Sequence, residues 1–356
     1  MDHALRRART VGRLDALELD ALLVTRLPNV RYLTGFSGSN AQALVRRDGL
    51  VFFTDGRYDE QSRHEVADAE RVIYREGFLP IEEHVGTGAR VGFESAGVTY
   101  RYWERLRERL GGRELVPTGP EIERLRIAKE RDEISRIAAA QETADVAFER
   151  VALGGALREG VTERAIALAL ETAMREAGAD DAGFDAIVAF GENAAEPHHH
   201  PGDRELRRGD VVKLDFGALV DGYHSDMTRT VAFGEPTSEL REIRDAVAAG
   251  QRAGIEAVKP GASLREVDAA ARDAIAALGY GERFPHGLGH GVGLEIHEEP
   301  FLHWTADDVL LEGSVVTIEP GVYVPGLGGV RIEDMVEVTA DGAREIPRST
   351  KELVVL

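Results

Sequence analysis

The sequence predicts an α/β domain over residues 1–120 followed by an α+β domain over residues 121–356. Three observations support this fold class. The chain has 356 residues, which is more than one ordinary domain of about 150 residues contains. Short apolar segments alternate with helical patterns through the first third, whereas residues 121–182 are mostly helical in pattern. From residue 185 onward, strand and turn patterns predominate.

In the first domain, short strands alternate with helices, which indicates a mixed or parallel sheet. The helical patterns fall at residues 2–18, 58–67 and 100–110. The strand patterns fall at residues 21–25, 41–47, 50–54, 71–75 and 90–94. Pro117, Gly119 and Pro120 then interrupt the chain before a helix that starts near Glu121, and we place the domain boundary there.

The second domain begins with helices and continues mainly with strands. The expected helices cover residues 121–153, 162–178, 238–254 and 263–278. Strand patterns joined by short turns occupy most of the sequence from residue 185 onward. We therefore expect helices packed on a mainly antiparallel sheet.

The composition is that of a globular chain whose negative charge disfavours binding to polyanions. Hydrophobic residues make up 43% and charged residues 30% of the chain, as in ordinary globular proteins. The formal net charge of −20 is spread along the sequence, which argues against nucleic acid and anionic membranes as partners. We find neither a signal-peptide core near the N-terminus nor an apolar run of about 18 residues, so we expect a cytoplasmic protein without a membrane partner.

The stretch "HGLGHGVGLEIHEEP", residues 286–300, places His286, His290 and His297 among regularly spaced glycines. Glycine occupies every second position from 287 to 293, and each glycine inside a helix costs about 1 kcal/mol relative to alanine. The pattern therefore favours an extended segment whose backbone other groups can approach closely. The alternative is a glycine-rich surface loop with incidental histidines.

The segment "VVKLDFGALVDGYHSDMTRTV", residues 211–231, predicts two strands joined around a "VDG" turn. If the hairpin pivots between residues 220 and 221, Asp215 lies directly opposite Asp226. Like charges in that arrangement destabilise a sheet unless a cation neutralises them.

The segment "SVVTIEPGVYVPGLGGVRIEDMVEV", residues 314–338, predicts a second hairpin of the same kind. A pivot at Gly326 places Glu319 opposite Glu333. A solvated edge of a sheet is the alternative for each acid pair, and a shift of the register by one residue would undo either pair. Two opposed pairs together with a histidine cradled by glycines favour a cation site.

The chain contains no cysteine, so a bound metal must be held by oxygen and imidazole nitrogen. Four carboxylates and one imidazole suit two divalent ions such as Mn²⁺, Co²⁺ or Zn²⁺. Two such ions about 3.5–4 Å apart can activate water and polarise a carbonyl group, which is the chemistry of metal-assisted hydrolysis. The neighbouring histidines are then free to contact a substrate.

These residues, in their local contexts, resemble the pita-bread metallopeptidases, in particular the Xaa-Pro peptidases (aminopeptidase P and prolidase). The motifs that carry the resemblance are "LDFG" with Asp215, "SDMTRT" with Asp226, "GLGHGVGLEIHE" with His290, "IEPGVY" with Glu319 and "RIEDM" with Glu333. The resemblance extends over about residues 120–350. It implies that Asp226 and Glu333 bridge both ions, that Asp215 binds one, and that His290 and Glu319 bind the other.

The same resemblance implies three catalytic residues. His198, in "AEPHHHPGDRELRRGD", is similar to a histidine that steadies the substrate or the tetrahedral intermediate. His297 is similar to one that hydrogen-bonds the scissile carbonyl, and Glu319 would shuttle a proton. His199 and His200 receive no role, and we expect both to be exposed.

Three more residues are implied to bind substrate or to support the metal ligands. His286 and Arg331 are similar to residues that line a proline pocket, and Arg331 lies two residues from Glu333, where it can orient that ligand. Tyr323 is a third candidate. The alternatives are a structural role for His286 and simple packing for Tyr323.

The N-terminal third carries its own resemblance. "RYLTGFSGSNAQALV" followed by "FFTDGRY" is similar to the N-terminal domain of aminopeptidase P, which is of the creatinase/prolidase type. Methionine aminopeptidases typically lack this domain, and creatinases fit the retained metal ligands less well.

The expected activity is therefore that of an Xaa-Pro aminopeptidase, which cleaves between an N-terminal residue and a following proline in peptide substrates. The alternative is an Xaa-Pro dipeptidase. A pita-bread protein that binds peptides without chemistry is less favoured, because every metal ligand is present. A structural metal-binding protein is less favoured, because paired histidines accompany the ligands. The resemblance also implies a homodimer or a higher homo-oligomer.

Overall fold

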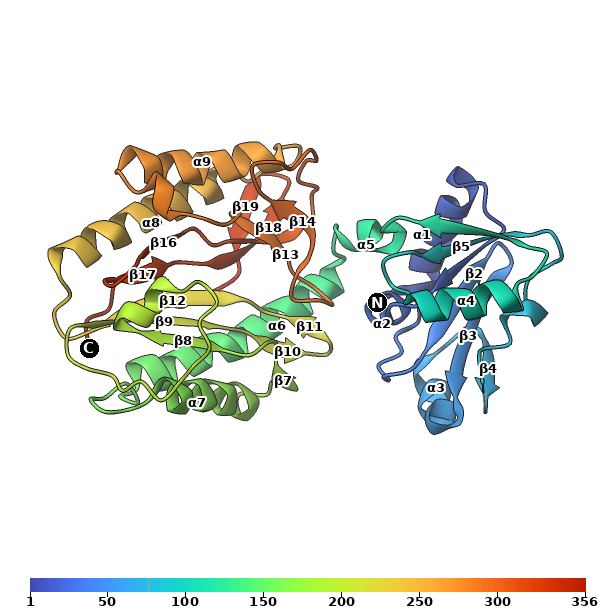
Figure 1. Ribbon diagram of the computed structural model, residues 1–356, viewed down its shortest axis with the longest axis horizontal. Coiled ribbons are helices and arrows are strands. Elements are labelled where there is room, and N and C mark those ends of the chain that lie inside the picture. Colours follow the sequence, from blue (N-terminus) through green and yellow to red (C-terminus); the bar gives the residue numbers. More distant parts are fainter. Residues whose placement is uncertain (76) are drawn as a thin grey trace. The chain divides into compact units, whose positions relative to one another are not determined.

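The computed structural model describes residues 1–75 and 77–356, which form two compact units, Met1–Arg126 and Ile127–Leu356 (Figure 1). The fold class predicted from the sequence is confirmed for both units. In the part of the chain that the structure describes, no helix has both the length and the apolar character needed to cross a bilayer.

The first unit contains a six-stranded mixed sheet. In spatial order its strands are β4 (Glu70–Tyr74), β3 (Gly49–Asp55), β2 (Gln42–Arg46), β1 (Ala21–Val24), β5 (Arg90–Glu94) and β6 (Glu114–Thr118). Its helices are α1 (His3–Ala16), α2 (Leu27–Thr34), α3 (Asp59–Glu65), α4 (Tyr100–Arg109) and α5 (Glu121–Arg126). Strand β1 is antiparallel to β2 and parallel to β5, which gives the sheet its mixed character.

The sequence patterns did not reveal β6 or α2. The segment that leads into α2 is held from far along the chain, because the buried Glu94 carboxylate accepts the backbone N–H groups of Thr25 and Arg26 at 2.6 and 2.8 Å. A helix normally announces its start by a polar residue of its own. Contacts supplied from another strand leave no such signal in the sequence around the start of the helix.

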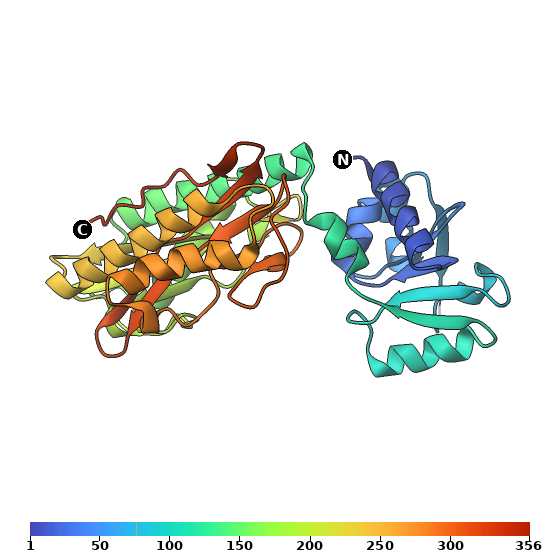
Figure 2. The same cartoon turned by 90° about the horizontal axis from the view of Figure 1, so that it is seen from above.

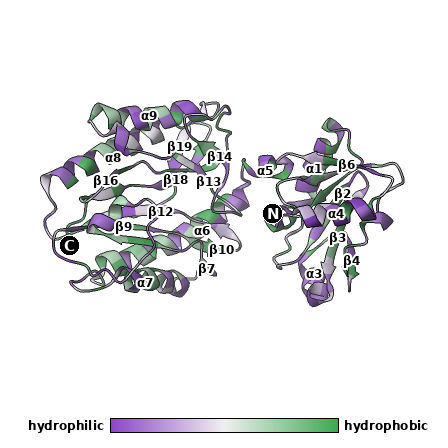
Figure 3. Ribbon diagram, viewed as in Figure 1, coloured by the Kyte–Doolittle hydropathy of each residue, from purple (hydrophilic) through white to green (hydrophobic). Residues whose placement is uncertain are grey.

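The second unit places strands between two pairs of helices. The helices are α6 (Arg131–Phe148), α7 (Glu163–Glu176), α8 (Ser238–Ala257) and α9 (Leu264–Ala277). Figures 1 and 2 show α8 and α9 side by side on one side of the strands, with α6 and α7 on the other. In Figure 3, α7, α8 and α9 carry both hydrophobic and hydrophilic residues, as helices with one buried face do.

All pairings between the named strands of this unit are antiparallel. One sheet consists of β12 (Met227–Phe233), β9 (Asp210–Phe216) and β8 (Ile187–Phe190). A second consists of β14 (Glu298–Leu302), β13 (Gly289–Gly291), β15 (Val315–Ile318), β18 (Asp334–Thr339) and β19 (Gly342–Glu345). Smaller sheets join β11 (Tyr223–His224), β10 (Ala218–Val220) and β7 (Asp181–Ala182), and β16 (Gly321–Val324) with β17 (Gly328–Arg331).

Two hydrophobic cores fill this unit, one beneath each helix pair. The first joins α6 and α7 to β8, β9 and β12 through residues such as Phe148, Leu170 and Phe216. The second joins α8 and α9 to the strands from β14 to β18 through residues such as Ile243 and Ile318. The acid-bearing strands therefore come from both halves of the unit.

The predicted register of the first hairpin is wrong by two residues. Strands β9 and β12 pair Asp215 with Thr228, so Asp226 is its diagonal rather than its direct neighbour. The hairpin turns at Asp221 and Gly222, whose φ angles of 49° and 78° are those of a two-residue type I′ loop. A shift by two residues keeps both acids on the same face of the sheet.

The predicted register of the second hairpin is correct. Ile318 pairs with Asp334, and Gly321 pairs with Arg331. The position of Glu319 therefore corresponds to that of Glu333, in the short break between the β15–β18 and β16–β17 ladders. At this break neither carboxylate is part of a regular strand, and both reach the same pocket.

Candidate active site

A pocket of about 470 Å³ in the second unit is lined by every predicted site residue except Tyr323. Asp215 comes from β9, and Asp226 immediately precedes β12. Glu319 follows β15, and Glu333 immediately precedes β18. Four carboxylates from two sheets thus converge on one cavity.

The glycines around His290 allow neighbouring backbone to lie unusually close. A Cβ atom on Gly289 would lie 2.0 Å from the carbonyl oxygen of Thr317, and one on Gly291 would lie 2.3 Å from that of Glu299. Both distances are far below van der Waals contact, so only glycine fits between these strands. The extended segment expected from the glycine spacing is therefore present as β13, and it aims His290 into the pocket.

The imidazole of His290 has its two nitrogens in different surroundings. Its Nδ1 lies 3.1 Å from the carbonyl oxygen of Gly291, to which it donates. Its Nε2 lies 3.6 Å from Oδ2 of Asp226 and 3.3 Å from Oε1 of Glu319. A backbone acceptor at Nδ1 is the arrangement that leaves Nε2 available to bind a metal ion.

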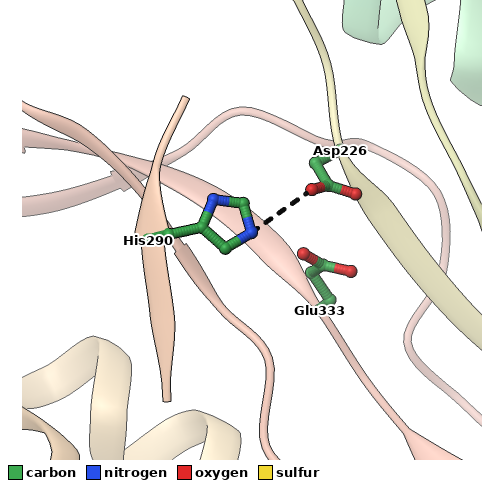
Figure 4. Close-up of side chains that lie close together, drawn as sticks. All are labelled: Asp226, His290 and Glu333. Carbon is green, nitrogen blue, oxygen red and sulfur yellow. Dashed lines mark ion pairs between the residues drawn. The ribbon is translucent and has the colours of Figure 1, made fainter. Parts of the chain in front are cut away.

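Asp226, His290 and Glu333 form a cluster with the geometry of a metal site (Figure 4). One ligand atom from each residue lies within 4.8 Å of the others, and all three residues are buried. Figure 4 shows the His290 imidazole and both carboxylates directed toward a common point. The donor set of oxygen and imidazole nitrogen fits a divalent ion of the Mn²⁺, Co²⁺ or Zn²⁺ type.

The electrostatics of the carboxylates also fit a cation. Burial raises the pKa of Asp226 well above its ordinary value, and the charges of Glu333, Asp215 and Glu319 raise it further. Burial and the neighbouring Glu319 and Asp215 likewise raise the pKa of Glu333 well above its ordinary value. Burial also raises the pKa of Asp215. These groups lack enough positive charge nearby, which divalent ions would supply.

Glu319 behaves differently from the other three acids. Burial alone would raise its pKa, but the hydrogen bond and charge of His290, together with Arg331, lower it to about 2. Thr317 Oγ1 also donates to Glu319 Oε1 at 3.1 Å. Glu319 is therefore ionised throughout the neutral range in the metal-free protein.

Arg331 lies behind the carboxylates and links several of them. Its guanidinium donates to Asp215, and its Nε lies 4.0 Å from Oε2 of Glu319. Its Nε also donates to Thr228 Oγ1 at 2.9 Å, and Thr228 Oγ1 in turn donates to Glu333 at 2.6 Å. This chain of contacts can orient the acids, as the position of Arg331 near Glu333 suggested.

Tyr323 is placed differently from the prediction. Its side chain is buried outside the pocket lining, where the hydroxyl accepts from Arg331 Nη1 at 2.9 Å and lies 3.0 Å from His286 Nε2. Both partners do line the pocket. Tyr323 thus connects two lining residues rather than facing the cavity.

The histidines predicted to be catalytic lie at the pocket surface. His198 and His297 are exposed and line the cavity, and the His297 ring lies 4.3 Å from that of His290 between centroids. His200 is exposed, as expected. The prediction for His199 is wrong, because its side chain is only 12% exposed.

His199 is mostly buried because it contacts a buried acid, Glu163. Nε2 of His199 lies 2.9 Å from the Glu163 carboxylate, which is 1% exposed, and Nδ1 lies 2.8 Å from Glu196. A buried carboxylate requires hydrogen-bonding partners, and His199 supplies one of them. Glu163 is 36 residues away in sequence, so no local pattern revealed this contact.

The apolar wall of the pocket was not found from the sequence. It includes Phe184, Ile187, Ile296, Phe301 and Trp304. Ile187 is paired with Asp215 in the β8–β9 ladder. Only the pairing of Ile187 with Asp215, which joins segments far apart in sequence, could have indicated that Ile187 belongs to the pocket wall.

Comparison with known proteins identifies the family. Residues 135–340 match metallopeptidase family M24, and residues 6–128 match the creatinase/prolidase N-terminal domain. The chain therefore belongs to metallopeptidase family M24, as the resemblance of its motifs predicted, and it is a peptidase.

Similar proteins span nearly the whole chain. An Xaa-Pro dipeptidase of Pyrococcus horikoshii is 37% identical over 96% of this chain and 96% of its own length. The solved structure of an Xaa-Pro dipeptidase from Bacillus anthracis has a TM-score of 0.95 at 39% identity, with all of both chains covered. An X-Pro aminopeptidase structure from Thermotoga maritima has a TM-score of 0.88 at 33% identity, covering 97% of this chain and 100% of that one.

Proposed function

We propose that this protein is an Xaa-Pro dipeptidase, which hydrolyses dipeptides whose second residue is proline. The observation that carries the hydrolytic part is the convergence of four carboxylates and His290 in one pocket. The dipeptidase names of similar full-length proteins at 37% and 39% identity support the alternative over our first expectation, an Xaa-Pro aminopeptidase. The aminopeptidase stays as the second candidate, because the Thermotoga maritima structure carries that name.

Asp215, Asp226, His290, Glu319 and Glu333 would hold two divalent ions. When bound, such ions supply Lewis acidity that polarises the scissile carbonyl and makes water acidic enough to react at neutral pH. The pair of ions is supported by the family resemblance and by the charge of the pocket, since four carboxylates carry more negative charge than one divalent ion neutralises.

The remaining steps belong to side chains of the chain itself. Glu319 is ionised and can carry a proton from the attacking water to the proline nitrogen that leaves. His198 and His297 lie at the pocket surface, where their N–H groups can donate to the oxygen that becomes negative in the transition state. His286 and Arg331 line the cavity and would bound the space for the proline ring.

We also propose a homo-oligomer located in the cytoplasm. The assembly rests on the family resemblance, and the location is the one expected from the sequence. Light scattering of the purified protein would test the assembly.

The activity is tested with Ala-Pro, Ala-Pro-Ala and Ala-Leu, each with Mn²⁺, Co²⁺ or Zn²⁺ added to chelator-treated protein. We expect the largest kcat/KM for Ala-Pro and little turnover of Ala-Leu. Preference for Ala-Pro-Ala would establish the aminopeptidase instead, and equal rates for Ala-Leu and Ala-Pro would remove proline specificity. Peptide binding without turnover in the presence of metal would indicate a non-catalytic protein.

A further inference from the structure

The His198 imidazole is not fixed by its own contacts. Among the residues that the structure describes, none makes a hydrogen bond to this ring, and the side chain is exposed at the pocket. Its position therefore depends on the backbone on both sides of it, which is held after His198 by the contact of His199 with Glu163 and before it by residues 194–197. A catalytic donor must be placed to within about 0.5 Å to be effective, so whatever fixes this segment matters for the reaction.

Lys213 holds that segment from inside the unit. Its side chain is fully buried on β9, and its Nζ donates to the carbonyl oxygens of Ala194, Glu196 and Pro197, at 3.4 Å for Ala194 and 3.2 Å for Pro197. The Pro197 carbonyl also accepts from Arg331 Nη1 at 3.2 Å. Three carbonyl acceptors within residues 194–197 thus tie the turn before His198 to the strand that carries Asp215.

A lysine at this place requires a specific reason. Burying an ammonium group is unfavourable unless hydrogen bonds replace its water, and a methionine or leucine would fill the same space without that demand. No carboxylate oxygen lies within ion-pair distance of Nζ among the described contacts. The hydrogen bonds of Lys213 Nζ all go to carbonyl groups of the segment that leads into His198.

We propose that Lys213 is a positioning residue that holds His198 over the pocket by bracing residues 194–197. The proposal rests on the proposed peptidase reaction for its kinetic readout. A competing explanation is that Lys213 only balances the charge of the metal ligands, since Asp215 is two residues away on the same strand face. The two explanations differ in what a neutral substitution does to metal content and to His198.

The test is a double-mutant cycle with Lys213→Met, His198→Ala and the double variant, all loaded with metal. We expect each single variant to lower kcat by about 10²-fold or more, the scale of one lost transition-state donor, with metal content unchanged. Because both act through one imidazole, the double variant should lie within about threefold of His198→Ala alone. Losses that multiply, or loss of metal from Lys213→Met, would overturn the proposal.

Lys129→Met is the matched control. Lys129 is also a buried lysine of this unit, but its Nζ pairs with Glu298 at 2.7 Å and does not contact residues 194–197. Any loss that it causes should multiply with that of His198→Ala. If Lys213→Met fails to fold, Lys213→Gln enters the same cycle, because its shorter neutral side chain cannot reach all three carbonyls.

Hydrogen exchange gives a readout that does not depend on activity. Amides of residues 191–200 should exchange faster in Lys213→Met or Lys213→Gln than in the unmodified protein, and Lys129→Met should leave them unchanged. Unchanged exchange in the Lys213 variants would contradict the bracing role. Absence of Xaa-Pro turnover in the unmodified protein would instead contradict the proposed function while leaving this comparison valid.

Discussion

At the scale of single residues, the pocket is defined by an excess of buried negative charge. Asp226 and Glu333 are buried, and burial together with neighbouring carboxylates raises the pKa of both. His290 and Arg331 are the positive groups that face them most directly, and Arg331 already donates to Asp215. The folded protein thus holds these acids in an unfavourable state that a divalent cation would relieve.

Asp226→Asn distinguishes the electrostatic repulsion that the Asp226 carboxylate causes from its role as a metal ligand. The substitution removes one buried charge, so the metal-free protein at pH 8 should be as stable as the parent or more stable, by about 1 kcal/mol. The rise in Tm on adding Mn²⁺ should shrink, because a ligand is lost. Urea unfolding and thermal melts with and without metal measure both effects. A less stable apoprotein with an unchanged metal-induced rise would show that Asp226 has a structural role.

His290 and His297 are adjacent but should respond differently. His290→Ala removes the imidazole whose Nε2 faces Asp226 and Glu319, so bound metal and activity should fall together. His297→Ala should keep its metal and lose about 10²–10³-fold in kcat, the scale of one oxyanion donor. Elemental analysis beside kinetics distinguishes them. Loss of metal from the His297 variant would reverse the two assignments.

At the scale of elements, strand register determines which acids meet. The second hairpin was predictable, because the segment around Gly326 is short and the apolar residues alternate cleanly on both sides. The first was placed two residues out of register, although Asp221 and Gly222 form the sequence pair most typical of a two-residue loop. The α2 helix and the burial of His199 were not predictable, because Glu94 and Glu163 reach them from distant segments.

The candidate site was predictable to a similar extent. The predicted ligands and His198 carry recognisable local motifs, and the structure brings them to one pocket. Lys213 and the apolar wall carry no motif, because their importance arises only from contacts between segments far apart in sequence. Periodicity and motifs identify residues that act on a ligand, whereas supporting contacts require the fold.

Gly289→Ala tests the close approach of β13 and β15. The new methyl group would meet the Thr317 carbonyl oxygen at 2.0 Å, so the strands must separate and His290 must move. We expect a loss of about 1–3 kcal/mol in unfolding free energy, as in overpacked cores, together with weaker metal binding. Gly202→Ala is the control, because its methyl group would have no neighbour closer than 3.6 Å. Equal effects of both changes would contradict the argument.

At the scale of the whole molecule, metal binding should depend on pH. Asp226 and Glu333 have folded-state pKa values above their unfolded ones, so their contribution to the stability of the metal-free protein is present at low pH. That contribution is lost as pH rises through the raised values. Glu319, with a pKa of about 2, stays ionised over this range. A bound cation must displace the protons on Asp226 and Glu333.

The Tm difference between metal-loaded and metal-free protein should therefore widen between pH 5.5 and pH 8. Calorimetry at several pH values with and without Mn²⁺ measures it. Asp226→Asn should flatten the dependence, because one of the two titrating acids is gone. A difference that narrows toward pH 8 would contradict the raised pKa values.

The two hydrophobic cores of the second unit give the metal site a role in how this unit unfolds. Asp215 and Asp226 are attached to the core beneath α6 and α7, whereas His290, Glu319 and Glu333 are attached to the core beneath α8 and α9. Ions bound between these residues would connect the two cores. They would add to the contacts that already join the two halves, such as those of Arg331 with Asp215 and of Thr228 with Glu333, so chelation should make the calorimetric transition of this unit broader and less cooperative.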